Sequence, residues 1–224
     1  MITNQTLDFL SGLKENNNRE WFLLHHSEYE AAKEEFLDTV VGLLNSISEF
    51  DPVIARSHLA PESCIMRIFR DVRFSRDKTP YKPGFFAFIC KDGRKSPNAG
   101  YYLHVEPGAS FAGGGLYMPE PKVLEKTRSA INLHFDEWLS IVNEKKLLGQ
   151  FAEGVKPSGA TKRPPKGYDD SNPAIEYLKY KGYYTQRFFT DKEVSSPGFV
   201  ASLSDSFKVV MPMVGFLNNS INGL

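Results

Sequence analysis

The sequence predicts an α+β fold, in which helices flank a central, mainly antiparallel sheet and a long helix lies near the N-terminus. Apolar residues are spaced by three and four up to residue 50, alternate in short segments up to residue 118, and then return to helical spacing. Turns join the short segments directly, whereas parallel pairing would need crossover helices between them. Composition is ordinary for a soluble globular chain. A chain of 224 residues can form one large domain or two small ones, and the pattern of elements favours a single domain over residues 1–224.

Two helices are predicted before residue 51. Residues 5–15 form the first, and Asn16-Asn17-Asn18 ends it. Asn18 is a suitable N-cap for the second, long helix, with the acidic Glu20 in its first turn. The second helix carries one apolar stripe, formed by Tyr29, Ala32, Phe36, Val40, Leu43, Ile47 and Phe50. Asp51-Pro52 ends this helix, because proline disfavours helical backbone in the residue before it.

The middle of the chain predicts strands separated by turns such as Lys91-Asp92-Gly93 and Pro107-Gly108. The predicted strands are residues 64–69, 85–91, 101–106 and 111–118, the last loosened by three consecutive glycines.

Helical spacing returns in residues 119–132 and 135–148. Residues 152–170 are rich in proline, glycine and lysine and are expected to form an ordered loop. Asn172-Pro173 then suits the N-cap and first position of another helix. Residues 183–190 predict a further strand, and the chain from Pro197 onward is expected to be helical, with a kink near Pro212.

Several features point to a cytoplasmic protein without a membrane partner. Cys64 and Cys90 lie in apolar runs without ligand spacing, so we expect buried, reduced thiols and no disulfide. The N-terminal segment contains Asp8 and no long apolar stretch, which argues against a secretory signal or an anchor. The histidines lack the spacing of zinc ligands, so no metal site is expected, and the sequence specifies no cofactor.

The chain is electrically polarised although its formal net charge is zero. Nine basic and three acidic residues lie between Arg67 and Lys95, and seven basic and three acidic residues between Lys156 and Arg187. By contrast, two basic and seven acidic residues lie between Arg19 and Phe50. If the two basic stretches meet in space, the protein has one positive face.

The densest charge lies in residues 67–82, which read RIFRDVRFSRDKTPYK and hold six basic and two acidic residues. Pro80 and Pro83 exclude a continuing helix there. Arginine grips phosphate or carboxylate through a planar fork, and lysine adds a point charge. We therefore predict a site for an anionic, phosphate-bearing ligand, either a small molecule such as a nucleotide or a nucleic acid. Its candidate residues are Arg67, Arg70, Asp71, Arg73, Asp77, Lys78, Tyr81 and Lys82.

These residues resemble a family. The order R-x-x-R-D-x-R-F, followed by D-K and a tyrosine, is similar to the signature of the domain of unknown function numbered twenty-four sixty-one. The segments N-N-x-R-E-W-F at residues 16–22 and K-R-P-P-K-G-Y at residues 162–168 also resemble that family. The resemblance covers nearly the whole chain and implies no particular chemistry, so whether the protein is an enzyme stays open.

A second basic segment is either a candidate clamp for the same ligand or a solvated loop. Its candidate residues are Lys162, Arg163, Lys166 and Tyr168.

One alternative to the anion site is a structural or protein-interaction module, in which Asp71 and Asp77 neutralise the arginines in an internal ion-pair network. Another is a magnesium-dependent enzyme that transfers phosphoryl groups or cleaves phosphodiesters, because Mg²⁺ needs few protein carboxylates. Its candidate ligands are Asp71, Asp77, Asp92 and Glu106.

Overall fold

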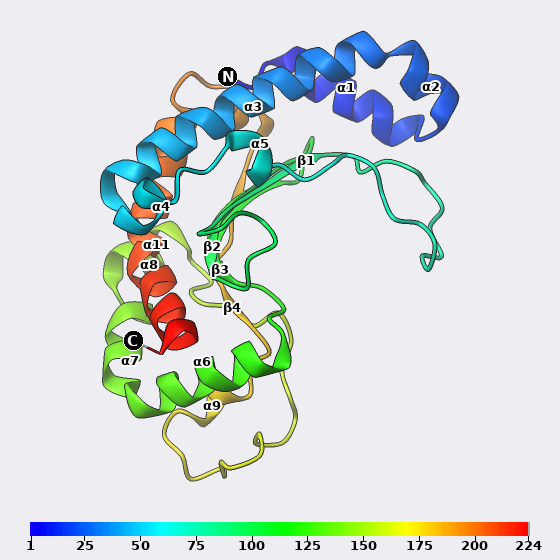
Figure 1. The fold of residues 1–224 in the computed structure, drawn as a ribbon. Helices are drawn as coiled ribbons and strands as arrows, with labels where there is room; N and C mark the ends of the chain where they lie inside the picture. Colours follow the sequence, from blue (N-terminus) through cyan, green and yellow to red (C-terminus); the bar gives the residue numbers. More distant parts are fainter. Residues whose placement is uncertain (224) are drawn as a thin grey trace. The chain divides into compact units, whose positions relative to one another are not determined.

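The computed structural model describes residues 1–223 and has the predicted α+β architecture, helices with a mainly antiparallel sheet of five strands (Figure 1). The chain divides into two compact units. The first unit contains residues 1–94, 102–112 and 188–205, and the second contains residues 95–101, 113–187 and 206–224. Three strands (β2, β3 and β5) and the last helix contribute residues to both units, and the expectation of a single domain stays a prediction.

The first unit begins with five helices. They are α1 (Asn4–Glu15), α2 (Arg19–Leu24), α3 (His26–Phe50), α4 (Pro52–Ser57) and α5 (Pro61–Cys64). Asn18 caps α2 as predicted, because its Oδ1 accepts a hydrogen bond from the Trp21 N–H (2.9 Å). The sequence predicted one helix from there to Phe50, but the helix is interrupted at His25. The His25 ring nitrogen Nδ1 lies 2.8 Å from the Trp21 carbonyl oxygen and closes the end of α2.

The sequence predicted a strand at residues 64–69, and this prediction is wrong. Residue 64 belongs to a helix, and residues 65–69 do not form a continuous strand. Cys64 ends α5, which Pro61 starts with its fixed helical φ. The residues after it make only isolated antiparallel bridges, Ile65 with Ala87 and Phe69 with Tyr81. Prolines 80 and 83 lie in the opposing segment and have no N–H to donate, so a continuous ladder does not form.

The sheet has the order β1-β2-β3-β4, and β5 pairs with β3. Its strands are β1 (Phe85–Ile89), β2 (Gly100–Val105), β3 (Ser110–Leu116), β4 (Tyr183–Tyr184) and β5 (Arg187–Phe189). The three strands predicted between residues 85 and 118 are confirmed, and the strand predicted at 183–190 is split in two. Gly115, at φ 139°, lies opposite Tyr184, and a Cβ there would lie 2.2 Å from the Tyr183 carbonyl oxygen. Gly115 therefore allows β3 and β4 to approach each other closely. The sequence had predicted only that the glycines loosen this strand.

The core of the first unit lies between β1 and α3. Phe85, Ala87 and Ile89 of β1 are buried, and they alternate with less buried residues. The Phe85 ring stacks on Phe36 of α3, with centroids 5.2 Å apart. Phe36 belongs to the apolar stripe that the sequence predicted, so this stripe is the face of α3 that packs on the sheet.

The remaining helices are α6 (Pro121–Leu133), α7 (Phe135–Val142), α8 (Lys145–Gln150), α9 (Ile175–Leu178), α10 (Asp191–Val194) and α11 (Phe199–Asn222). Trp138 of α7 is completely buried. Asn172 accepts a hydrogen bond from the Ala174 N–H (2.8 Å), and α9 begins at Ile175, two residues after the predicted start. Both cysteines are free and buried, as predicted.

Within residues 1–223, α11 is the one helix whose length and composition would let it cross a membrane. Its most apolar stretch is 44% buried inside the fold, and Leu203, Phe207 and Val210 are fully buried. The core helix of a soluble protein has the same length and composition, so this helix is weak evidence for a membrane span.

Candidate functional site

Residues 67–82, which we call the basic arm, leave the sheet just before β1 and extend as a long loop beside α1 and α2 (Figure 1). Two backbone hydrogen bonds close the base of the arm. The Arg70 N–H donates to the Pro80 carbonyl oxygen, and the Lys82 N–H donates to the Ile68 carbonyl oxygen, both at 2.8 Å. The arm is therefore an irregular hairpin whose two sides are held together next to the sheet.

Tyr81 anchors the arm to the first two helices. Asn17 Nδ2 donates to the Tyr81 carbonyl oxygen, and the Tyr81 N–H donates back to Asn17 Oδ1, both at 3.0 Å. The Tyr81 ring stacks on Phe22 of α2 at a centroid distance of 4.1 Å and is 4% exposed. The sequence placed Tyr81 among the ligand contacts, whereas the structure places its ring in the anchor.

Arg70 holds the two sides of the loop together. Its Nη1 donates to Asp77 Oδ2 and to Thr79 Oγ1. Asp77 Oδ1 also accepts from the Thr79 N–H (2.9 Å) and hydroxyl (2.8 Å). The hydrogen bond from Arg70, followed by those from Thr79, lowers the pKa of Asp77 to about 2, so this carboxylate is ionised at neutral pH.

Arg73 forms the second ion pair of the arm. Its Nε and Nη2 donate to the two carboxylate oxygens of Asp71, at 3.0 and 2.7 Å. This bidentate contact lowers the pKa of Asp71. The Arg73 side chain is nevertheless 76% exposed, and Phe74 beside it is 96% exposed. An arginine and an aromatic ring are thus presented together to solvent.

Both lysines of the arm donate to backbone carbonyls. Lys78 Nζ donates to the Val72 carbonyl oxygen (2.9 Å), and Lys82 Nζ donates to that of Arg67 (2.8 Å). Burial, followed by the charge of Arg67, lowers the pKa of Lys82. Lys78 is exposed to solvent. Neither ammonium group is neutralised by a carboxylate in residues 1–223.

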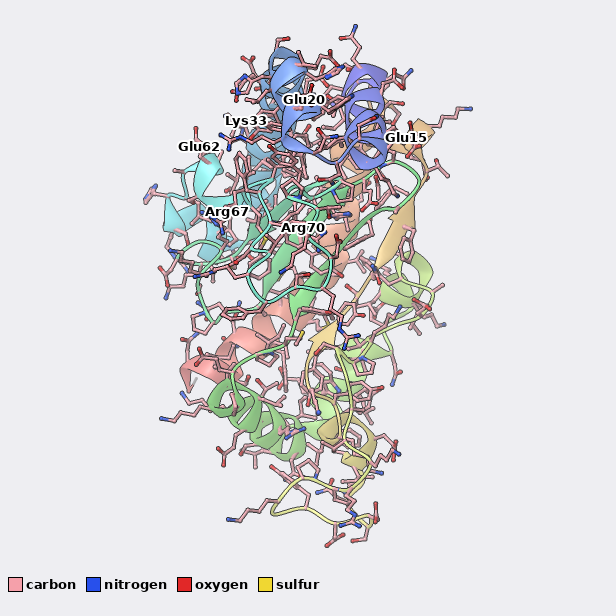
Figure 2. All side chains as sticks on the ribbon, turned by 90° about the vertical axis from the view of Figure 1, so that its right-hand side faces the viewer. Glu15, Glu20, Lys33, Glu62, Arg67 and Arg70 are labelled. Atoms are coloured by element: carbon pink, nitrogen blue, oxygen red, sulfur yellow. The ribbon has the colours of Figure 1, made fainter. Side chains whose placement is uncertain are left out.

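Arg67 and Arg76 are exposed, and in the described chain their guanidinium groups have no hydrogen bond or ion pair. Figure 2 shows Arg67 and Arg70 on the arm, which projects toward the viewer in front of the strands. The two acids of the arm thus pair with Arg70 and Arg73, as the structural interpretation of the sequence expected. Whether the other cations of the arm bind an anion stays a prediction.

A family model described as conserved hypothetical protein (DUF2461) matches residues 5–216. The chain belongs to the DUF2461 family. No curated protein and no solved structure matches it significantly. Two of the motifs on which the resemblance was based, residues 16–22 and 67–82, are in contact in this DUF2461 protein through Asn17, Phe22 and Tyr81.

Sequence reasoning missed Asn17 and Phe22 as parts of the site. Both lie in the N-N-x-R-E-W-F segment, so the signal was present, but their partner Tyr81 is 64 residues away from Asn17 in the chain. Only the folded DUF2461 chain shows that this segment positions the basic arm.

The second basic segment lies in the other compact unit of the DUF2461 chain. Lys162, Arg163 and Lys166 are exposed, and Tyr168 is half-buried. The segment has no helix or strand, and the Thr161 hydroxyl donates to the Arg163 carbonyl oxygen (2.8 Å). A role as a second clamp stays a prediction.

The carboxylates named for magnesium have separate partners. Asp71 and Asp77 pair with Arg73 and Arg70, and Glu106 contacts Lys14 Nζ and His104 Nε2, both at 3.0 Å. Asp92 is an exposed turn residue at φ 66°. Residues 1–223 contain no group of three or more His, Cys, Asp or Glu side chains placed to hold a metal ion. The magnesium alternative stays a prediction.

Proposed function

We propose that this protein binds a phosphate-bearing polyanion along the exposed surface of the basic arm. The contacts would come from Arg67, Arg73, Arg76 and Lys78. The proposal rests on the positive charge of the arm that its two acids do not neutralise. Its two acids each pair with one arginine, whereas the guanidinium groups of Arg67 and Arg76 have no hydrogen bond or close ion pair in the described residues. Guanidinium groups with unused donors are suited to phosphate oxygens.

The shape of the arm favours an extended ligand over a single small molecule. Small-molecule sites are concave and bury most of their ligand. The first unit has a cavity of about 570 Å³, which is lined by His25 and by residues of α1, α2 and α3. No residue of the arm lines this cavity. The arm is instead a projecting hairpin, on which successive phosphates can contact successive cations.

The ion pairs of the arm serve the same purpose. An exposed ion pair adds little to overall stability. The pairs Arg70–Asp77 and Arg73–Asp71 instead restrict a segment that has no regular secondary structure. Restricting the loop before binding reduces the conformational entropy lost on binding. The structural network that the sequence offered as an alternative thus becomes part of the proposed site.

The proposal includes a cytoplasmic location and no membrane partner. The two free, buried cysteines are in keeping with a reducing compartment. Phosphate-bearing polymers such as nucleic acids are present there.

Salt-dependent binding tests the proposal. We expect a labelled oligothymidylate to bind, as followed by fluorescence anisotropy, with an affinity that falls steeply between about 50 and 200 mM salt because phosphate contacts release counterions. Arg67→Ala and Arg76→Ala should each weaken binding and reduce the slope of log K against log salt by roughly 0.7.

Arg56→Ala is the matched control, because Arg56 is an exposed arginine of α4 in the same unit and outside the arm. It should leave both affinity and slope unchanged. Absent or salt-independent binding, or an equal effect of the Arg56 change, contradicts the proposal.

A further inference from the structure

Four strands of the first unit carry a connected row of aromatic rings. We call Phe86, Tyr102, His104, Phe111 and Phe188 the aromatic face. Phe86 lies 6.0 Å from His104 between ring centroids, and His104 stacks on Phe111 at 4.7 Å. Phe111 in turn contacts Tyr102 at 5.9 Å and Phe188 at 6.0 Å. Phe86 alternates with Phe85 and Ala87, whose side chains enter the core beside α3, so the row lies on the opposite face of β1.

Within residues 1–223, this face stays partly accessible. Phe188 is 61% exposed, and Phe86, His104 and Phe111 are half-buried, although Tyr102 is buried. The core side of β1, by contrast, is almost completely buried. A single exposed aromatic ring needs no explanation, but contiguous apolar surface that stays accessible marks an interaction site.

The aromatic face is continuous with the basic arm. The Met66 N–H, just before the arm, donates to the Phe86 carbonyl oxygen at 2.8 Å. Just after the arm, a Cβ on Gly84 would lie 3.1 Å from His104 Cε1 and 2.6 Å from the Val105 carbonyl oxygen. The chain at both ends of the arm therefore contacts the strands that carry the rings. At Gly84 the contact is so close that only glycine fits.

The charge near the rings is compatible with an anionic strand. Glu106 is the carboxylate that contacts His104, and it is also paired with Lys14. The arm adjoining the rings carries Arg67 and Arg76, which have no hydrogen bond or close ion pair within residues 1–223.

We infer that the aromatic face is a stacking surface for the bases of a single-stranded nucleic acid whose phosphates lie along the basic arm. This inference rests on the proposed function. Proteins that bind single strands combine cations that follow the backbone with aromatic rings on which the bases stack. A duplex hides its bases in the stack, and a mononucleotide offers only one base to the four accessible rings of this row, so a flexible strand fits both features.

The test compares an oligothymidylate with an abasic strand of the same length, which keeps the phosphates and lacks the bases. We expect the oligothymidylate to bind more tightly. Phe188→Ala should weaken its binding roughly 5- to 100-fold, the effect of losing one stacked base. The same variant should bind the abasic strand as the original protein does. Because Phe188 is largely exposed, the variant should fold, and Phe188→Tyr should retain the preference for bases.

Tyr117→Ala is the control, because Tyr117 is 62% exposed and lies outside the aromatic face. Equal affinity for the two strands, or no effect of Phe188→Ala, overturns this inference and leaves the proposed function standing. Failure of both strands to bind overturns both. Self-association that Phe188→Ala abolishes, without any preference for bases, would also overturn it and assign the face to a second copy of the chain.

Discussion

At the scale of single residues, Asn17 shows how the arm is held. Its side-chain amide both donates to and accepts from the main chain of Tyr81, as a neighbouring strand would do. Tyr81 is buried, so its N–H depends on this partner. One asparagine in a turn between two helices therefore positions a segment far away in the sequence.

We expect Asn17→Ala to destabilise the protein by about 1–3 kcal/mol, because it leaves buried main-chain groups of Tyr81 without partners. For a chain of this size, that corresponds to a fall in melting temperature of roughly 3–10 °C. Thermal unfolding followed by circular dichroism measures it. Asn4→Ala is the control, because Asn4 is exposed at the start of α1 and has no side-chain hydrogen bond in the described structure. Equal melting temperatures would show that Asn17 does not anchor the arm.

At the scale of elements, the contact of α1 with α2 is fixed by a glycine. A Cβ on Gly12 would lie 2.8 Å from Trp21 Cζ2, closer than side-chain atoms approach. Trp21 is itself held between rings, with His25 at 3.9 Å and Phe9 at 5.9 Å. The tryptophan cannot move away without disturbing both neighbours, so α1 needs glycine here despite its low helix propensity.

Two glycine-to-alanine changes should therefore have opposite signs. Gly12→Ala should destabilise by about 1–3 kcal/mol, because overpacking outweighs the gain in helix propensity. Gly215→Ala, inside α11, should stabilise by roughly 0.5–1 kcal/mol, because nothing lies within 4 Å of its Cβ position. Urea unfolding gives both free energies. A stabilised Gly12→Ala variant would mean that Trp21 is not confined.

Elements that depend on local pattern were predictable from the sequence. Helix α1, the Asn18 cap and strands β1 to β3 follow from apolar spacing, capping chemistry and turn residues. The break at His25 and the loss of the strand at residues 64–69 were not predicted. The first depends on a ring closing a helix end, and the second on prolines in a strand partner that pairs only after folding.

The candidate site was likewise predictable where it depends on local sequence, and not where it depends on contacts made in the folded chain. Charge density alone identified the basic motif, and the sequence suggested that Asp71 and Asp77 neutralise arginines. It did not show which arginine pairs with each acid, or that the Tyr81 ring stacks on Phe22. The row of rings that includes Phe188 joins strands far apart in the chain, so no local pattern displays it.

At the scale of the whole molecule, the part of the arm between residues 69 and 80 adds charge and no core. Ile68 and Tyr81 at its base are buried, whereas none of the residues 69–80 between them is. The two sides of the loop already meet where Arg70 donates to Thr79. The fold and the proposed binding surface are thus separable, and a deletion should remove one without the other.

Replacing residues 71–78 by two glycines should therefore leave a protein that unfolds cooperatively, with a melting temperature within about 2 °C of the original, because exposed residues contribute little to stability. The same deletion removes Arg73, Arg76 and Lys78, so oligothymidylate binding should weaken and its salt dependence should become shallower. Calorimetry and anisotropy on one preparation measure both. A deletion variant that binds as before refutes the arm as the phosphate site. Loss of cooperative unfolding would instead favour the arginines as parts of a structural network, because the fold would then depend on their ion pairs.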